Sequence, residues 1–390
     1  MTTPSPPLGL YVHLPFCKTR CGYCDFAVVT DRDDSQSLYV DCLLREISHW
    51  AQESPLEFQT LYFGGGTPSR LAPSEWEGLV GSLRDHFRFA EDVEITAEAN
   101  PESATEALLS LWKGLGVNRV SLGVQSFKPR FLSLLDRLHT TEQAADAFRT
   151  MREVGIENRS LDLIYGLPGQ TLLDWEEDLE RALSISPRHI SFYNLILHPN
   201  LPVTQKALAA HTPDHEEVQA EMFLLAVDRL ESQGYEVYEL SNAALPGYSC
   251  RHNRLYWEGG EWLGLGLSAS SRFGGGYFAN PSTWSAYVDL WGPRGRRSPP
   301  SPRFPSPAER LLDAVMLSLR TREGLSLADL ETLLEAPLPD AFRRLRDQLW
   351  DEGYVRSAPE RISLTPKGWL VHSEITTRVV QALEGSPSRS

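Results

Sequence analysis

Short apolar segments alternate with amphipathic segments through the first half of this chain, and this alternation constrains the fold more than any other feature. The predicted strands, each followed by a loop rich in Gly, Pro or Asn, are 9–14, 60–63, 93–97, 119–124, 160–164 and 189–193. The predicted helices, with apolar residues at three- and four-residue spacing, are 37–50, 74–87, 105–115, 141–154 and 172–185. Strands that alternate with helices form a parallel sheet, so the sequence predicts an α/β fold, an open partial (β/α)6 barrel.

A stretch rich in Pro, Ser and Arg separates this region from a differently patterned one. Residues 293–307 read PRGRRSPPSPRFPSP and have no apolar periodicity, which is typical of a linker. Beyond it, segments 308–320, 327–334 and 340–352 are predicted helices, and two short strands follow in the order of a winged helix. We therefore expect a partial barrel at 1–240, a barrel-closing segment at 241–292, the linker at 293–307, and a small winged-helix-like α+β domain at 308–390.

The loop after the first predicted strand contains Cys17, Cys21 and Cys24 in the spacing CxxxCxxC. Thiolates at this spacing can bind three irons of a [4Fe–4S] cubane and leave the fourth iron open to a small molecule such as S-adenosylmethionine (SAM). A zinc site or a redox thiol pair is the alternative, but a closed zinc site requires four ligands and only His13 lies nearby. The spacing therefore favours an iron–sulfur cluster.

Polar residues lie where the predicted strands end, which is the chemically active edge of a parallel barrel. Gly65 and Gly66 belong to a three-glycine run that Thr67 follows, and successive N–H groups of such a run can face a carboxylate or another polar ligand, although a tight turn is the alternative. Glu98 ends the third strand and could accept a hydrogen bond from a ligand ammonium group, or it could be a solvated strand end.

Three more candidate residues lie on the fifth predicted strand or after the fourth. Asp162 lies between two leucines, and an unpaired carboxylate costs free energy in an apolar environment, so we expect it to face the barrel interior and a donor there. Structural pairing with a barrel arginine is the alternative. Gln125 follows the fourth strand and offers both donor and acceptor, and Arg137, twelve residues later, offers a planar cationic fork for carboxylates.

Six motifs over nearly the whole chain support a family resemblance: YVHLPFCKTRCGYCDF, GGGTP, AEANP, GVQSF, DLIYGLPGQT and HNRLYW. Together they resemble the radical SAM proteins of the oxygen-independent coproporphyrinogen III oxidase group, in particular the HemW heme chaperones. The resemblance implies a partial triosephosphate-isomerase-type barrel, a small C-terminal domain, a [4Fe–4S] cluster on the three cysteines, and bound SAM. The positions that match SAM contacts at the cluster are Tyr11, Gly65 and Glu98, and those that match a second SAM of the oxidases are Tyr23, Gly66, Thr67, Gln125, Arg137 and Asp162.

Two departures separate this chain from the decarboxylating oxidases. The oxidases carry a further cysteine two residues past the third one, where this sequence has Phe26, and an N-terminal extension where only ten residues precede Tyr11. Both differences favour the chaperone branch. Resemblance to that branch implies that the protein binds heme and transfers it to acceptor hemoproteins, including membrane-associated ones. The alternative function is that of an oxygen-independent coproporphyrinogen III oxidase, a radical oxidative decarboxylase.

The segment CRHNRLYW at 250–257 provides the candidate heme site. His252 is the expected axial ligand, because neutral imidazole commonly binds heme iron, and Tyr256, Trp257 and Trp262 could supply flat apolar surface. Apart from the resemblance, a loop histidine beside an asparagine is more often a hydrogen-bonded structural residue. Cys250 is the less suitable ligand, because transfer requires a ligand that dissociates.

Charge and composition limit the partners. The net charge is −15, from 37 Lys and Arg against 52 Asp and Glu, which opposes binding to a phosphate backbone. From Arg294 onward 15 basic residues face 13 acidic ones, so we expect the C-terminal domain to be a lid or protein-docking module and not a nucleic-acid binder. We expect a cytoplasmic protein, because no signal peptide and no apolar window of about 18 residues is present.

Overall fold

A curved, open sheet of eleven strands forms the centre of the computed structural model, which describes residues 7–30, 32–52, 56–209, 216–296, 298–358 and 360–384. Strands β1 to β6 are parallel and each pairs with the next. They are β1 (Leu8–Leu14), β2 (Glu57–Gly65), β3 (Arg88–Ala99), β4 (Arg119–Gln125), β5 (Asn158–Tyr165) and β6 (His189–Asn194). Each predicted strand lies within one of these six, and the predicted α/β class is confirmed.

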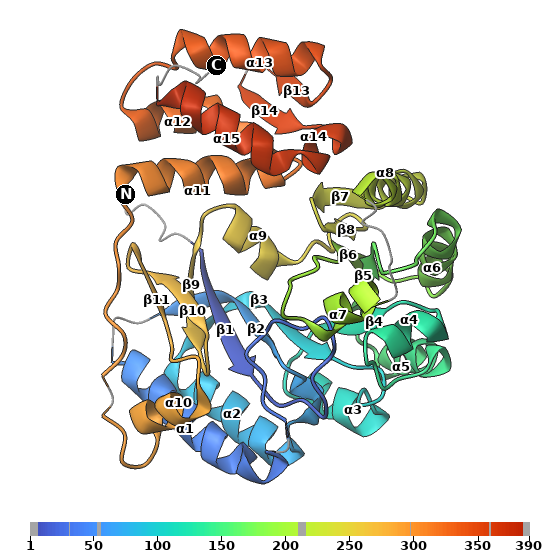
Figure 1. Ribbon diagram of the computed structural model, residues 1–390. Helices are drawn as coiled ribbons and strands as arrows, with labels where there is room; N and C mark the ends of the chain where they lie inside the picture. Colours follow the sequence, from blue (N-terminus) through green and yellow to red (C-terminus); the bar gives the residue numbers. More distant parts are fainter. Residues whose placement is uncertain are drawn as a thin grey trace.

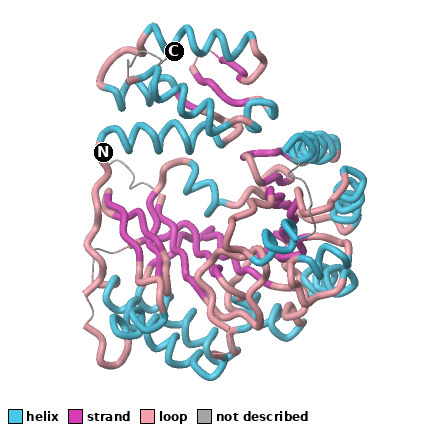
Figure 2. The backbone as a smooth tube through the Cα atoms, viewed as in Figure 1, coloured by secondary structure: helices cyan, strands magenta, loops and turns pink. Residues whose placement is uncertain are grey.

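Helices line the outside of the curved sheet, as Figures 1 and 2 show. Capping boxes begin two of them, with Thr140 and Gln143 at α5 (Thr141–Val154) and Thr171 and Asp174 at α6 (Leu172–Ser184). The predicted helices correspond to α1 (Gln36–Trp50), α2 (Pro73–His86), α3 (Glu106–Gly114), α5 (Thr141–Val154) and α6 (Leu172–Ser184). Three more have no predicted counterpart: α4 (Pro129–Leu134), α7 (Pro202–Ala209) and α8 (Glu216–Ser232).

Five further strands lengthen the sheet at its two ends. Next to β1 lie β9 (Glu261–Leu265), parallel to it, and then β10 (Ser270–Phe273) and β11 (Gly276–Ala279). Next to β6 lie β8 (Asn242–Ala244) and β7 (Glu236–Glu239), both antiparallel to their neighbours. Within the described residues β11 and β7 are the outer edges of the sheet and do not pair with each other. Segment 241–292 therefore lengthens the sheet and leaves the barrel open, whereas the sequence analysis expected it to close the barrel.

A fully buried carboxylate joins this extension to the first helix. Glu46 of α1 accepts hydrogen bonds from the Gly266 N–H (2.9 Å), the Asn280 side-chain amide (2.6 Å) and the Tyr287 hydroxyl (2.7 Å). Burial raises the pKa of Glu46 to about 7, although these hydrogen bonds act in the opposite direction. Because Tyr287 lies on α10 (Trp284–Trp291), the Glu46 carboxyl connects α1, the turn after β9 and α10.

A small α+β domain follows and lies across one end of the sheet (Figure 1). Its first helix, α11 (Pro307–Arg320), precedes a three-stranded antiparallel sheet of order β12-β14-β13. Trp369 packs against Phe223 of α8, and the two rings are 6.5 Å apart. The other predicted elements correspond to α12 (Leu327–Leu334), α13 (Asp340–Asp351), β13 (Val355–Ala358) and β14 (Arg361–Leu364), whereas β12 (Leu325–Ser326), α14 (Pro366–Leu370) and α15 (His372–Leu383) have no predicted counterpart.

None of the helices in the described part of the chain combines the length and the apolar character that crossing a membrane requires.

Candidate functional site

Two adjoining cavities open where the parallel strands end. The first has a volume of about 450 Å³ and is lined by the cysteine loop and the residues that end β2 to β6. The second has a volume of about 990 Å³ and lies between the ends of β1 to β3, the β9–β11 strands, α9 (Arg251–Trp257) and α11. The residues that line both cavities are Asp25, Phe26, Gly65, Glu98 and Tyr193.

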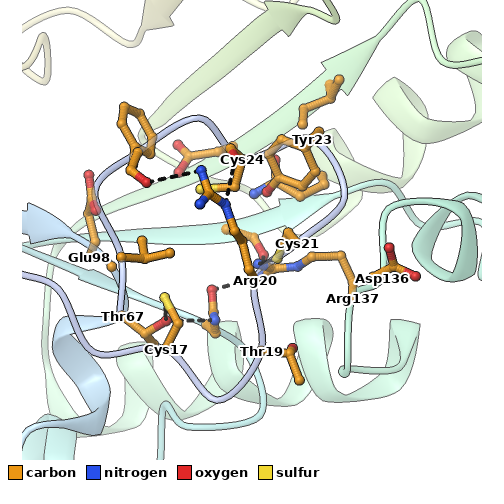
Figure 3. Close-up of a pocket in the computed structure, with 18 of the residues that line it drawn as sticks. Cys17, Thr19, Arg20, Cys21, Tyr23, Cys24, Thr67, Glu98, Asp136 and Arg137 are labelled. Carbon is orange, nitrogen blue, oxygen red and sulfur yellow. Dashed lines mark hydrogen bonds between the residues drawn. The ribbon is translucent and has the colours of Figure 1, made fainter. Parts of the chain in front are cut away.

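The structure brings Cys17, Cys21 and Cys24 to the wall of the first cavity, where all three are partly buried free thiols (Figure 3). Within the described ranges, no group of three or more His, Cys, Asp or Glu side chains is arranged to hold a single metal ion. Three thiols on one cavity wall match the three cysteine ligands of a cluster with an open fourth iron, whereas a closed zinc site requires four ligands.

His13 does not complete a zinc site. Its Nε2 is 2.8 Å from the Ala27 carbonyl oxygen, and its Nδ1 is 3.1 Å from the Tyr11 hydroxyl. His13 also lines the second cavity and not the first, where the three thiols lie, so it does not supply the fourth ligand that the zinc alternative requires.

A hydrogen-bonded chain ties the cysteine loop to the barrel (Figure 3). The Arg137 guanidinium donates to the Asn100 side-chain oxygen at 2.8 Å and lies 3.6 Å from the Cys21 sulfur. The Asn100 amide donates to the Thr67 hydroxyl at 3.3 Å, and that hydroxyl is 3.5 Å from the Cys17 sulfur. The loop that carries the thiols is thus oriented by residues that follow β2, β3 and β4.

The glycine run has a different local role from the one that the sequence suggests. The Gly65 N–H donates to Glu98 at 3.2 Å, and the Gly66 and Thr67 N–H groups donate to carbonyl oxygens at the entry of the cysteine loop, both at 2.9 Å. The expectation that successive N–H groups face a ligand is therefore wrong for these three. Gly65 has a φ of +107°, and a Cβ at Gly66 would collide with the Pro15 backbone, so close packing against the loop requires the glycines.

Glu98 and Asp162 both line the first cavity, and both are held by hydroxyl donors. The Tyr62 hydroxyl donates to Glu98 at 2.8 Å, and burial raises the pKa of Glu98 to about 7. The Ser121 hydroxyl donates to Asp162 at 2.9 Å, and burial raises the pKa of this carboxyl as well. The expected donor to Asp162 is therefore a serine. In the described part of the chain, no arginine lies within ion-pair distance of Asp162, as the alternative required.

The remaining predicted SAM contacts are divided between the cavities. Gln125 and Tyr23 line the first cavity, and Gln125 has a φ of +69°, which an L-residue rarely adopts. Tyr11 lines the second cavity instead, together with Gly65 and Glu98. The three positions that match SAM contacts at the cluster, Tyr11, Gly65 and Glu98, therefore line one cavity together, and Tyr11 is separated only from the positions that match a second SAM.

His252 lies on α9, not in the expected loop, and lines the second cavity with an exposed fraction of 1%. Its Nδ1 is 2.7 Å from the Thr60 hydroxyl, and its Nε2 is 2.7 Å from the Tyr256 hydroxyl. Burial, and secondarily the charge of Arg119, lowers the pKa of His252 to about 3, so the imidazole is neutral. The Tyr256 ring packs edge to face on Trp262 at 4.6 Å, which gives this cavity an aromatic wall.

Glu94 of β3 fixes the start of α9. Its carboxylate accepts hydrogen bonds from the Arg251 N–H (3.1 Å) and the His252 N–H (3.2 Å), which compensates N–H groups that the helix leaves unpaired. Cys250, directly before α9, is completely buried and lies 3.6 Å from the same carboxylate. Burial raises the pKa of the Cys250 thiol to about 12, which makes it a poor candidate for a thiolate ligand.

Replacing Glu94 by Ala is expected to destabilise the protein by about 2 kcal/mol, because two N–H donors of α9 lose their acceptor. Urea unfolding measures this difference in the free energy of unfolding. Glu91→Ala, an exposed carboxylate of the same strand, is the matched control and should change stability little. Equal stability of the two variants would contradict the capping role.

Several residues that organise the site were missed by the sequence analysis. Asn100 had a usable signal, since it stands in AEANP two residues after Glu98 at the end of a predicted strand. Thr60 and Ser121 had none, because they are ordinary strand residues whose partners, His252 and Asp162, are 192 and 41 positions away. Glu94, likewise, reads as one more charged residue in a strand.

Comparison with known families assigns most of the parallel sheet and the C-terminal domain to two different family models. Residues 11–182 match the radical SAM superfamily, and residues 306–371 match the HemN C-terminal domain. Among solved structures, coproporphyrinogen III oxidase (HemN) from Escherichia coli superimposes with a TM-score of 0.82 at 26% identity, over 98% of this chain and 92% of that one.

Curated relatives match over nearly the full length. The protein named heme chaperone HemW from Synechocystis sp. is 35% identical over 97% of both chains. The protein of the same name from Bacillus subtilis is 31% identical over 94% of this chain and 97% of its own. This chain belongs to the radical SAM superfamily and, within its HemN and HemW group, to the HemW family.

Proposed function

We propose that this protein is a heme chaperone, which binds heme in the second cavity and transfers it to acceptor hemoproteins. The observation that carries the proposal is the position of His252, which the HNRLYW motif places on the wall of a large aromatic cavity next to the cysteine loop. The relatives named heme chaperone HemW, which match almost the entire chain, support it.

Radical SAM membership implies a [4Fe–4S] cluster and SAM, and the first cavity fits both. Cys17, Cys21 and Cys24 are the proposed cluster ligands. When bound, such a cluster supplies an open iron for the amino and carboxylate groups of SAM. The proposed SAM contacts, all of which except Tyr11 line the first cavity, are Tyr11, Tyr23, Gly65, Gly66, Thr67, Glu98, Gln125, Arg137 and Asp162.

His252 is the proposed axial ligand of heme iron. The imidazole is neutral, which leaves one ring nitrogen with a lone pair. If Thr60 accepts from Nδ1–H, then Nε2 accepts from the Tyr256 hydroxyl, and coordination requires Tyr256 to give up this 2.7 Å hydrogen bond. A ligand that can return to a hydroxyl donor suits a protein that must release its heme.

His252→Ala is expected to weaken heme binding at least about tenfold and to alter the Soret band of the complex, because iron loses its axial nitrogen. The measurement is an absorption titration of anaerobically reconstituted protein with heme. His86→Ala, an exposed histidine of α2 that lines neither cavity, is the matched control. Undiminished affinity with an unchanged Soret band would remove His252 from the proposal.

The second candidate function is that of an oxygen-independent coproporphyrinogen III oxidase, which the similarity to HemN over nearly the whole fold favours. The two candidates differ in outcome. Heme uptake in stoichiometric amount without any product supports the chaperone, whereas conversion of coproporphyrinogen to protoporphyrinogen at enzymatic rates supports the oxidase.

The acceptors and the compartment belong to the proposal as well. The acceptors are hemoproteins, with membrane-associated ones among them, and the protein works in the cytoplasm. The five free cysteines support a reducing compartment.

A further inference from the structure

The second cavity carries a line of side chains that the proposed iron ligation does not use. Trp262 of β9 lies opposite Arg272 of β10, and Arg272 lies opposite Tyr277 of β11. Tyr277 in turn pairs with Arg303 through two backbone hydrogen bonds of 2.8 Å. Residues opposite each other on neighbouring strands project to the same face of a sheet, and all four of these side chains line the cavity.

Most charges on this wall are already paired. Arg303 forms an ion pair with Glu309 at 2.6 Å, and the Tyr277 hydroxyl donates to Asp313 at 2.9 Å. Arg320, the third arginine of the cavity, forms an ion pair with a buried glutamate at 2.6 Å. The remaining acidic groups that line the cavity are Asp25 and Glu98, which also belong to the first cavity.

Arg272 differs from the other two arginines. Among the described residues, no carboxylate lies within 4.0 Å of its guanidinium nitrogens, and no side-chain hydrogen bond from it is formed. The guanidinium is held over the Tyr277 ring, 5.7 Å from its centroid, and the residue is half-buried. The planar guanidinium of Arg272 is thus held in place without a carboxylate partner. Its two parallel N–H groups match the two oxygens of a ligand carboxylate.

The aromatic wall connects this arginine to the proposed iron ligand. His252 contacts the Tyr256 hydroxyl, the Tyr256 ring packs on Trp262, and Trp262 lies opposite Arg272. One face of the cavity therefore runs from an imidazole, across two flat rings, to a cation. This order fits an amphiphilic tetrapyrrole, with a metal at its centre, an apolar ring and carboxylates at one edge.

We infer that Arg272 binds a propionate carboxylate of the tetrapyrrole and so sets its orientation in the cavity, an inference that rests on the proposed function. The carboxylated edge then faces the β10–β11 strands, and the macrocycle lies against Tyr256 and Trp262. The cation discriminates between a free carboxylate and a neutral ester, because only the carboxylate forms a charge-assisted, bidentate pair.

The test compares heme with its dimethyl ester, in which both propionates are neutral, by absorption titration of the full-length, cluster-loaded protein. Arg272→Gln is expected to weaken heme binding about tenfold and to leave the affinity for the dimethyl ester unchanged. Arg272→Lys should retain part of the affinity for heme, because the charge remains but the fork is lost. Arg88→Gln, an exposed arginine at the start of β3 that lines neither cavity, is the matched control and should match the wild type.

Equal binding of heme and the dimethyl ester by the wild type would overturn the inference and leave the chaperone function intact. Wild-type affinity of Arg272→Gln for heme would overturn it in the same way. If the wild type takes up neither compound, the proposed function fails, and the inference fails with it. Iron content and far-ultraviolet circular dichroism, measured on every variant, separate lost binding from lost folding.

Discussion

Replacing Cys21 by Ala is expected to abolish iron uptake by the N-terminal loop. The three thiols of this loop line one cavity, and a cage that uses three of them keeps only two ligands in the variant. Neighbouring groups do not substitute, because His13 lines the second cavity and not the first, and Arg137, which contacts the Cys21 sulfur at 3.6 Å, is a donor only. Iron and acid-labile sulfide per chain, measured after anaerobic reconstitution together with the visible spectrum, should fall to background.

Cys42→Ala is the matched control for this variant. Cys42 is also a free cysteine, but it is completely buried in α1 and lines neither cavity. Its removal should leave iron and sulfide at the wild-type level. A Cys21→Ala protein with wild-type iron and sulfide would refute the assignment of the loop as the cluster site.

The stability of the protein should decrease between about pH 4.5 and pH 7 through Glu46. Its folded-state pKa of about 7 lies above the ordinary value of 4.5, so the folded state binds more protons than the unfolded state in this interval. The stabilising contribution of this carboxyl is therefore fully present below pH 4.5 and is lost as the pH rises through 7. A shift of this size corresponds to a change in the free energy of unfolding on the order of 3 kcal/mol.

Glu46→Gln isolates this contribution, because the amide does not titrate. The difference in the free energy of unfolding between wild type and variant, from urea titrations at pH 5 to 8, should fall as the pH rises. The neighbouring groups Tyr39, Tyr287 and Cys42 have raised pKa values and stay uncharged in this range. Glu91→Gln, at an exposed position of β3, is the control for the substitution itself; a constant difference for Glu46→Gln would contradict the prediction.

The parallel core was predictable because its signals are local. Strands β1 to β6 contain short segments rich in apolar residues that turn residues follow, and the helices between them have one apolar face. The β9 strand was not predictable in the same way, because the segment Glu261–Leu265 becomes a strand by pairing with Leu8–Val12, some 250 positions earlier. The final helix, α15, was overlooked although Ile375, Val379 and Leu383 carry a helical spacing.

The candidate site was predictable as a set of residues but not as a set of contacts. The ends of parallel strands meet at one edge of a sheet, which is why Glu98, Gln125 and Asp162 could be placed together in advance. The partners of these side chains depend on the three-dimensional pairing of distant strands. The sequence therefore predicted a donor for Asp162 without identifying Ser121, and it gave no indication that Thr60 contacts His252.

The shared wall of the two cavities, which includes Phe26, Glu98 and Tyr193, has a thermodynamic consequence. If a molecule in one cavity shifts the side chains of this wall, the affinity of the other cavity for its occupant changes. Linkage is symmetric: the factor by which the first occupant changes the affinity for the second equals the factor in the reverse direction. Titration of one occupant with and without a saturating amount of the other therefore measures the coupling between the two cavities.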